Sequence, residues 1–359
     1  CCLTAEPVFR GRFYQQFFTA FNRSMPGTNT NSAGSKYNAF SSYSALNLLL
    51  LAQSHAAVKF KGDIQLAYTC PAGSFLTAAT VNDLLSINTL ALYLNPGDFK
   101  ISIGRFLPQW GVNKVFRPLD IFQPQTFLRH ALSFTGIDAL SVKYYINNLS
   151  SAELLMIPAA DWSDCSLAAR LEAHIGSFDL GVVSAYRGAE NYKLLGLSFQ
   201  GDILIGLSGE IYYRFNNPQD FFKSKDVNIF KSAFRVDYSF AKYFFIAAEY
   251  FYDSSGKKNY KNYSELLSAG KARMTLAEHY LAADFNILTY NKLNFGVSGI
   301  VNLNDNSFIF YPYFKYEILN GLQAGFSVYL FQGRKYREFN AERAGMGRVL
   351  LNLYGLFNF

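Results

Sequence analysis

Apolar and charged side chains alternate along most of this chain of 359 residues. Residues 58–66 read VKFKGDIQL, so Lys59, Lys61 and Asp63 fall on one face of an extended segment and the apolar residues on the other. The same alternation occurs in residues 8–14, 167–175 and 234–240. Because successive side chains of a β-strand point to opposite faces, this period of two predicts many strands, each with one apolar and one polar face.

The composition limits what those strands can build. Half of the residues are hydrophobic and 17% are aromatic, whereas only 16% are charged; soluble domains usually have about 25% charged residues. No run approaches the ~18 apolar residues of a membrane-spanning helix. The chain is therefore either a large soluble β protein or a β-barrel whose outer face contacts lipid.

The predicted strands are joined by connections that alternate between short and long. We expect about eighteen strands, near 6–18, 40–52, 55–69, 85–95, 98–107, 134–147, 150–160, 167–176, 178–188, 191–200, 202–214, 230–240, 242–252, 276–287, 291–302, 306–318, 321–333 and 347–359. Tight turns at 53–54, 95–97 and 147–149 follow every second strand, and long connections at 19–39, 70–84 and 108–133 follow the others. A soluble sandwich has no reason to sort its loops in this way.

This alternation is typical of a transmembrane barrel. We predict an all-β, antiparallel barrel of about 18 strands, with 16 as the alternative, short periplasmic turns and long extracellular loops. Residues 6–359 form its single domain, in the outer membrane of a Gram-negative bacterium. Residues 1–5 (CCLTA) are typical of the tail of a secretory signal, although a short frayed end, or less plausibly a lipid-modified cysteine, explains them as well.

The end of the chain carries a further signal. In residues 347–359 one face reads Val349, Leu351, Leu353, Gly355, Phe357 and Phe359, and Phe359 is the final residue of the sequence. This segment resembles the closing strand of Gram-negative outer-membrane β-barrels. The resemblance implies that Phe357 and Phe359 are part of the signal that the barrel-assembly machinery reads.

A second resemblance covers residues 104–124 only. The segment reads GRFLPQWG, then FRPLDIFQP from residue 116, and it is similar to a stretch of the alginate-export-like and related substrate-transporting porins. The loop 108–133 that contains it is the longest connection, and we predict that it folds inward to narrow a pore. The alternative is an extracellular loop that packs on its neighbours.

The composition of this loop suggests how it would work. Its aromatic residues would anchor it, Asp120 would pair with an inward Arg or Lys, and Lys114 and Arg117 would meet the solute. The predicted constriction set is Arg105, Trp110, Lys114, Arg117, Asp120 and Arg129.

Strand parity also predicts which charges face the lumen, because a charge on the lipid face near the membrane centre costs about 2–4 kcal/mol. The predicted basic wall is Arg10, Arg12, Lys59, Lys61 and Lys143, and the predicted acidic wall is Glu210, Asp237, Glu249 and Asp284. Opposed walls would orient polar solutes across the pore. The alternative is that these residues form ordinary ion pairs that fill the lumen.

Catalysis has little support in the sequence. None of the four histidines has metal-ligand spacing, and His174 with Glu172 and Arg170 indicates an ion-pair ladder rather than an acid–base site. We expect no catalytic residues, no cofactor, no metal and no nucleic-acid partner. Cys70 and Cys165 fall in predicted outer loops, and the sequence leaves open whether they are bridged.

Two functions remain. The first is an outer-membrane porin for passive diffusion of small hydrophilic, mainly anionic solutes. The second is a structural or adhesive barrel that acts through its extracellular loops. The expected partners are outer-membrane lipid, the barrel-assembly machinery and the solutes themselves. The sequence does not determine the oligomeric state.

Overall fold

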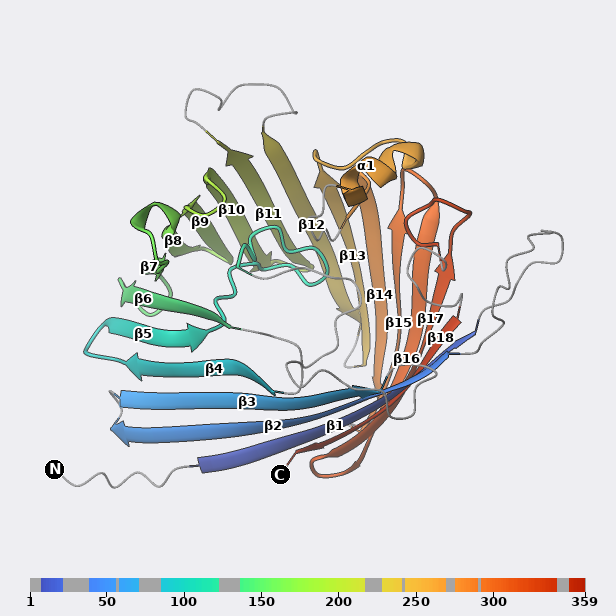
Figure 1. Cartoon of the computed structure of the whole chain (residues 1–359), viewed down its shortest axis with the longest axis horizontal. Helices are drawn as coiled ribbons and strands as arrows, with labels where there is room; N and C mark the ends of the chain where they lie inside the picture. Colours follow the sequence, from blue (N-terminus) through green and yellow to red (C-terminus); the bar gives the residue numbers. More distant parts are fainter. Residues whose placement is uncertain are drawn as a thin grey trace.

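The protein closes into one antiparallel barrel of eighteen strands (Figure 1). The structure is a computed structural model that describes residues 8–21, 39–55, 58–70, 85–122, 136–216, 228–240, 243–268, 275–289, 292–340 and 349–358. Each strand pairs with its neighbours in the chain, and β1 pairs with both β2 and β18, which closes the sheet. Closure leaves no unpaired strand edge. The predicted fold class and strand number are confirmed.

The eighteen strands are β1 (Val8–Phe21), β2 (Ala39–His55), β3 (Val58–Cys70), β4 (Leu85–Leu94), β5 (Phe99–Phe106), β6 (Ile137–Tyr145), β7 (Ser151–Ile157), β8 (Ser166–Ile175), β9 (Phe178–Arg187), β10 (Tyr192–Asp202), β11 (Gly206–Phe215), β12 (Ile229–Phe240), β13 (Phe244–Asp253), β14 (His279–Thr289), β15 (Leu293–Asn302), β16 (Ser307–Leu319), β17 (Leu322–Gln332) and β18 (Val349–Asn358). The helical elements are η2 (Trp162–Asp164), η4 (Tyr260–Asn262) and α1 (Tyr263–Ser268). No helix among these described residues is long and apolar enough to cross a membrane.

Several boundaries differ from the predicted ones. β2 continues to His55, so residues 53–54 belong to the strand and do not form the predicted turn, and β3 extends to Cys70, which was expected in a loop. β11 begins at Gly206 and not near residue 202. The connections still sort into two sets, and we call the two ends of the barrel the short-turn end and the long-loop end.

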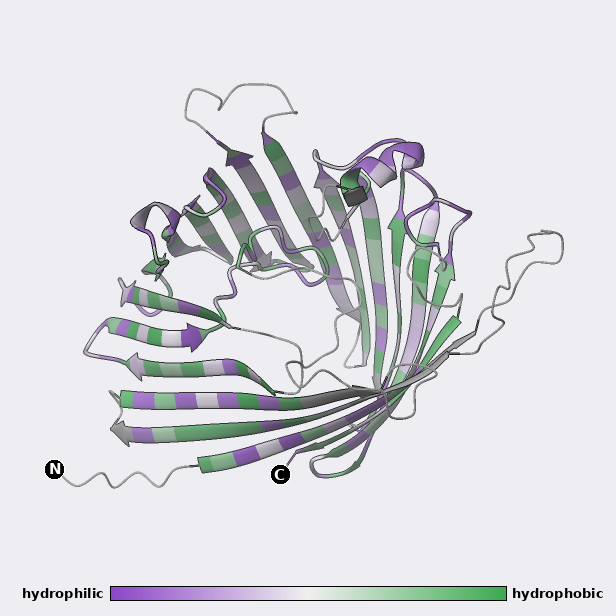
Figure 2. Cartoon of the chain, viewed as in Figure 1, coloured by the Kyte–Doolittle hydropathy of each residue, from purple (hydrophilic) through white to green (hydrophobic). Residues whose placement is uncertain are grey.

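The two faces of the wall differ in the way the sequence predicts. Hydrophilic and hydrophobic bands alternate along the strands (Figure 2). Phe9, Leu48, Leu154 and Leu197 are exposed, whereas small or polar residues such as Ala45, Ala91 and Ser141 are buried. A barrel that is surrounded by lipid needs this arrangement, with leucine and phenylalanine exposed on the outer face and small or polar residues on the inner face.

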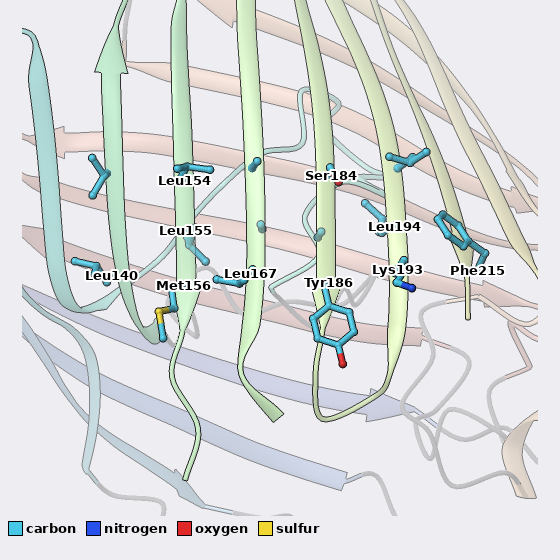
Figure 3. Close-up of a pocket in the computed structure, with 15 residues that line it drawn as sticks. Leu140, Leu154, Leu155, Met156, Leu167, Ser184, Tyr186, Lys193, Leu194 and Phe215 are labelled. Atoms are coloured by element: carbon cyan, nitrogen blue, oxygen red, sulfur yellow. The ribbon is translucent and has the colours of Figure 1, made fainter. Parts of the chain in front are cut away.

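The outer face also carries a groove of about 560 Å³ across β6–β11 (Figure 3). Its lining includes Leu140, Leu154 and Leu167, which are exposed on the outer face. Ala169 and Ser184 pair across β8 and β9 and leave a hollow between these larger side chains. Since the groove lies on the lipid-facing side, it does not belong to a path through the barrel.

Candidate functional site

The described residues that follow β5 lie inside the barrel (Figure 1). We call residues 107–122 the inner loop. Within it, the Asp120 carboxylate accepts hydrogen bonds from the backbone N–H groups of Trp110 and Gly111, at 2.9 and 2.8 Å. Gly111 is required here, because an added Cβ would lie 2.8 Å from Cβ of Arg117. These bonds fold residues 110–120 into a compact turn.

Two carboxylates of the barrel wall hold this turn in place. Glu210 of β11 accepts the N–H groups of Val112 (2.7 Å), Asn113 (2.8 Å) and Leu119 (2.9 Å). Glu249 of β13 accepts the N–H groups of three consecutive loop residues, Lys114 (3.4 Å), Val115 (3.2 Å) and Phe116 (2.6 Å). Both acids are 1% exposed. A buried carboxylate is stable only with such donors, so the loop and the two acids stabilise one another.

Apolar contacts complete the attachment. The ring of Phe116 is completely buried and stacks on Phe251 of β13, with 4.6 Å between ring centroids. Trp110 packs edge-on against Phe122 at 5.1 Å. Leu119 fits over Gly196 of β10, where an added Cβ would overlap its side chain. The anchoring by aromatic burial that the sequence predicts is therefore present for Trp110, Phe116 and Phe122.

Phe116 also reaches the packed residues at the long-loop end. It lies 5.8 Å from the ring of Tyr280, in a cluster that includes Tyr263, Leu266 and Phe339. We call these five residues the loop-end cluster. The inner loop is therefore continuous with the surface loops above it.

Glu338 closes the loop-end cluster from above. Its carboxylate accepts hydrogen bonds from the Tyr280 hydroxyl (2.5 Å), the Asn302 amide (2.7 Å) and the Leu276 N–H (3.0 Å). Burial, with the nearby Asp305 carboxylate, raises the pKa of Glu338 from 4.5 to about 8. This acid holds segments 275–280 and 333–340 together.

The structure divides the predicted constriction residues into three groups. Lys114 is exposed, and Arg117 is partly exposed and contacts Asp120 at 3.3 Å. Trp110 and Asp120 are buried in the turn, and Asp120 pairs within its own loop and not with a wall residue as expected. Arg129 and the rest of 123–133 lie outside the described residues.

Arg105 does not face the lumen, so its assignment to the constriction was wrong. The register pairs it with Leu90, whose side chain is exposed on the outer face, and with Asp138 of β6. Its guanidinium binds the Asp138 carboxylate at 2.5 Å. The pair lies at the loop end of β5, where an outward arginine with an acidic partner avoids the membrane centre.

The strand register shows which other charges face inward. Gly196 contacts the inner loop, and successive register partners Val183, Arg170, Glu153 and Lys143 share its face. Continuing through β5 to β1, the same face carries the other members of the predicted basic wall, Lys59, Lys61, Arg10 and Arg12. In the opposite direction it carries Glu210, Asp237, Glu249 and Asp284.

The basic residues differ in their partners. Lys143 binds Glu172 at 2.9 Å, and Glu172 also binds Arg170 at 2.8 Å, so this part of the wall is an ion-pair ladder, as expected near His174. Elsewhere in the described chain, Arg10, Lys59 and Lys61 form no salt bridge. Lys61 lies near the Asp63 carboxylate of the same strand, and the charges of Arg10 and Lys59 remain available to the lumen.

The acidic wall is not an open charged surface. Glu210 and Glu249 lie under the inner loop, Glu249 also lies 3.6 Å from Arg235, and Asp237 binds Arg235 at 3.0 Å. Asp284 accepts the Ser298 hydroxyl. Glu210 and Glu249 lie on the inner face but are covered by the inner loop, because parity identifies the face of a residue but not what packs on it.

Three features were missed or left open by the sequence. Ser208 of β11 donates to the Asn113 side chain at 2.7 Å and adds a further anchor for the inner loop. Several tyrosines line the inner face of β16–β18 and β1, and the alternate spacing of Tyr311 and Tyr313 is the signal that could have revealed them. Cys165 is a free thiol, and its sulfur accepts the Ala159 N–H at 3.4 Å. The side chain of Cys70 is outside the described part.

Comparison with known proteins supports the fold. The chain matches no protein-family model and no curated protein sequence. Among solved structures it is similar to OccAB4 of Acinetobacter baumannii, with a TM-score of 0.60, 9% identity, and 99% and 98% of the two chains covered. It is also similar to the Rhodopseudomonas blastica porin, with a TM-score of 0.52, 9% identity, and 99% and 100% covered.

A third similar structure is Wzi of Escherichia coli, an outer-membrane protein of capsule assembly described as a carbohydrate-binding β-barrel. Its TM-score is 0.59 at 10% identity, with 98% of this chain and 84% of that chain covered. At such identities the likeness establishes a common fold. The chain thus has the fold of outer-membrane porins.

Proposed function

We propose that this chain is an outer-membrane channel through which small hydrophilic solutes diffuse, and that the inner loop forms its constriction. The observation that carries the proposal is the attachment of residues 112–119 to Glu210 and Glu249 inside the barrel. A loop that only covered the surface would not need two buried carboxylates in the wall. A fixed loop inside a barrel narrows the lumen without closing the strands around it.

The proposed selectivity is for anions. Arg10, Lys59 and Lys61 on the inner face have no salt-bridge partner among the described residues, and Lys114 is exposed on the inner loop. Of the acids on this face, Glu172, Glu249 and Asp253 each pair with a cation, whereas Asp63 lies near Lys61 on β3 and offsets part of the positive charge there. Arg10, Lys59 and Lys61 outnumber Asp63 in this part of the wall and would give the lumen a positive potential that attracts anions. The net charge of +7 has the same sign.

The proposed location follows from the outer face. Exposed Leu, Phe and Val residues surround the wall, and only an apolar solvent makes such a surface stable. Lipid would also fill the outer groove between Leu154 and Leu167. The closed barrels with the same fold, including the Rhodopseudomonas blastica porin, support the assignment to a bacterial outer membrane.

The test is the reversal potential of single channels in planar bilayers under a KCl gradient. Lys59→Glu with Lys61→Glu should move the preference from anions toward cations, and the shift should weaken as salt screens the charges, over about 10 Å at 0.1 M and about 3 Å at 1 M. Lys59→Arg with Lys61→Arg keeps the charge and should behave like the parent. An unchanged reversal potential in the glutamate variant contradicts the proposed selectivity.

The alternative is a barrel that acts through its surface loops. The observation in its favour is the packed loop-end cluster, which Glu338 joins to segment 275–280. Wzi offers an example of this fold that is described as carbohydrate-binding. A purified, folded barrel that never conducts ions would favour this alternative over a channel.

A further inference from the structure

Five tyrosines form a strip along one side of the lumen. Tyr311 and Tyr313 lie on β16, Tyr329 on β17, Tyr354 on β18 and Tyr14 on β1. The ring of Tyr311 stacks on Tyr329 with 5.0 Å between centroids and an interplanar angle of 11°. Tyr311 also stacks on Tyr313 at 5.7 Å, and Tyr14 lies 6.0 Å from Tyr354. We call these residues the tyrosine strip.

The strand register places this strip on the inner face. Ser298 of β15 is the register partner of Asp284 on β14 and of Tyr311 on β16, so these three side chains share one face. It is the inner face, because Asp284 lies on the same face as Glu249. Tyr313 pairs with Ser327, and Ser327 pairs with Asn352, two positions from Tyr354 on β18. The inner loop is held by β11 and β13, so the strip occupies a different part of the wall.

Glycines on the neighbouring strands let two of these rings lie flat against the wall. An added Cβ at Gly325 of β17 would overlap the ring of Tyr354, and an added Cβ at Gly296 of β15 would overlap the ring of Tyr313. Each ring therefore covers a glycine with one face and turns its other face away from the wall. Tyr311, Tyr313, Tyr329 and Tyr354 are all partly exposed.

Side-chain amides border the rings. Asn352 donates to the Ser327 hydroxyl at 3.0 Å, and Asn286 donates to the Tyr313 hydroxyl at 2.8 Å. Within the described structure, the amide oxygens of Asn352, Asn286 and Gln323 accept no hydrogen bond. These oxygens are buried and lack a partner, so a rotation of the amide side chains toward the lumen would let them accept hydrogen bonds from a ligand that carries hydroxyl groups.

We propose that the tyrosine strip binds the pyranose rings of neutral saccharides. A pyranose has an apolar C–H face that stacks on a flat aromatic ring and hydroxyl groups around its edge that donate to amide oxygens. An aromatic or hydrocarbon solute would use the rings but leave the amides unpaired, which buried polar groups disfavour. A strongly charged solute would gain nothing from the five neutral rings, and the charged residues on this face beside them, Asp284 and Lys315, have opposite signs.

The inference depends on the proposed channel only for the route by which a sugar enters, so binding is tested without conduction. The probe is maltohexaose, added to the folded full-length protein in detergent micelles and observed by saturation-transfer difference NMR. We expect transfer to the sugar ring protons, and no transfer to sorbitol, a linear polyol without a ring.

The variants separate stacking from general wall structure. Tyr311→Ser with Tyr329→Ser should weaken maltohexaose binding about tenfold, because a stacked ring contributes about that factor. Tyr354→Leu still covers Gly325 but has no aromatic face, so it should weaken binding while the barrel stays folded. Tyr311→Phe keeps the face and should retain binding. Tyr93→Ser, on the inner face of β4, is the matched control and should bind like the parent.

Two results would overturn the inference. One is the absence of saturation transfer to maltohexaose in the parent protein. The other is equal transfer in the parent and in Tyr354→Leu, which would mean that the rings only cover the glycines of the sheet. If the protein conducts ions but binds no sugar, the channel proposal stands and this inference fails; if it binds sugar but never conducts, the reverse holds.

Discussion

Single carboxylates determine where the inner loop lies. Glu210 and Glu249 each accept three backbone N–H groups, and all six donors belong to residues 112–119. Backbone N–H groups exist at every non-proline residue, so their recognition does not depend on the loop's side chains. The position of the loop is therefore set from the wall, by two residues far from it in sequence.

Replacing either acid with glutamine should release its own group of amides. A glutamine side chain offers one acceptor oxygen and turns an N–H group toward another donor, which costs about 1–3 kcal/mol. Glu210→Gln should speed hydrogen exchange at Val112, Asn113 and Leu119 about tenfold or more. Glu249→Gln should do so at residues 114–116. If exchange is equally fast at all six amides in both variants, then Glu210 and Glu249 do not hold separate groups of loop amides.

Glu338 makes the loop-end cluster sensitive to pH. Its folded pKa is about 8 against 4.5 when unfolded, so the folded state binds more protons between these values. Its contribution to stability is complete below pH 4.5 and is lost as the pH rises to about 8. Hydrogen exchange in 275–280, corrected for the intrinsic rate, should accelerate from pH 5 to about pH 8. Glu338→Gln cannot ionise and should abolish that dependence.

As an element, the inner loop lies inside the barrel and covers two charged residues of the wall. Its turn lies over Glu210 and Glu249, and its Phe116 packs with Tyr280 and Phe339 in the loop-end cluster. Removing the loop would thus have two effects, a wider path and two newly solvated carboxylates.

Deleting residues 112–126 should raise conductance and shift selectivity toward cations. The barrel should still assemble, because β1 and β18 are untouched. Adding Glu210→Gln and Glu249→Gln to the deletion should keep the high conductance and restore anion preference. A deletion variant with the parent conductance would show that the constriction is built from wall side chains instead.

At the scale of the whole molecule, closure depends on the first and last strands. Phe357 of β18 pairs with Phe13 of β1 and with Leu322 of β17, and all three side chains belong to the outer face. The apolar band of the barrel is therefore continuous across the seam. The assembly role of Phe357 and Phe359 stays a prediction, and Phe359 lies outside the described residues.

Phe357→Gln should separate assembly from stability. If the closing strand is read by the assembly machinery, this variant should give less folded barrel in cell membranes and refold normally from urea into detergent. Phe13→Gln alters the register partner on β1 and should give the parent's yield in cells. Equal losses for both variants, in cells and in detergent, would mean that Phe357 acts only by packing.

The sequence predicted the strand number, the antiparallel order and the inward face of most charges. Each of these follows from local alternation and from the lengths of the connections. It was wrong about Arg105, because Gly104 takes the inward position at the end of β5 and the next residue, Arg105, therefore points to the outer face beside Leu90. It also placed a turn at 53–54 inside β2, where Gln53 and Ser54 look like turn residues but pair with β3 or continue the strand.

What local pattern determines in this protein is a closed wall with a lipid face and a polar face, because side-chain direction in a strand depends only on position along it. What only the tertiary structure decided is which polar residues remain open to the lumen. Glu210 and Lys61 have the same parity signal, yet one is buried under the inner loop and the other has no salt-bridge partner among the described residues. The difference comes from contacts between residues about 90 or more positions apart, such as Leu119 with Glu210, and no alternation in the chain encodes them.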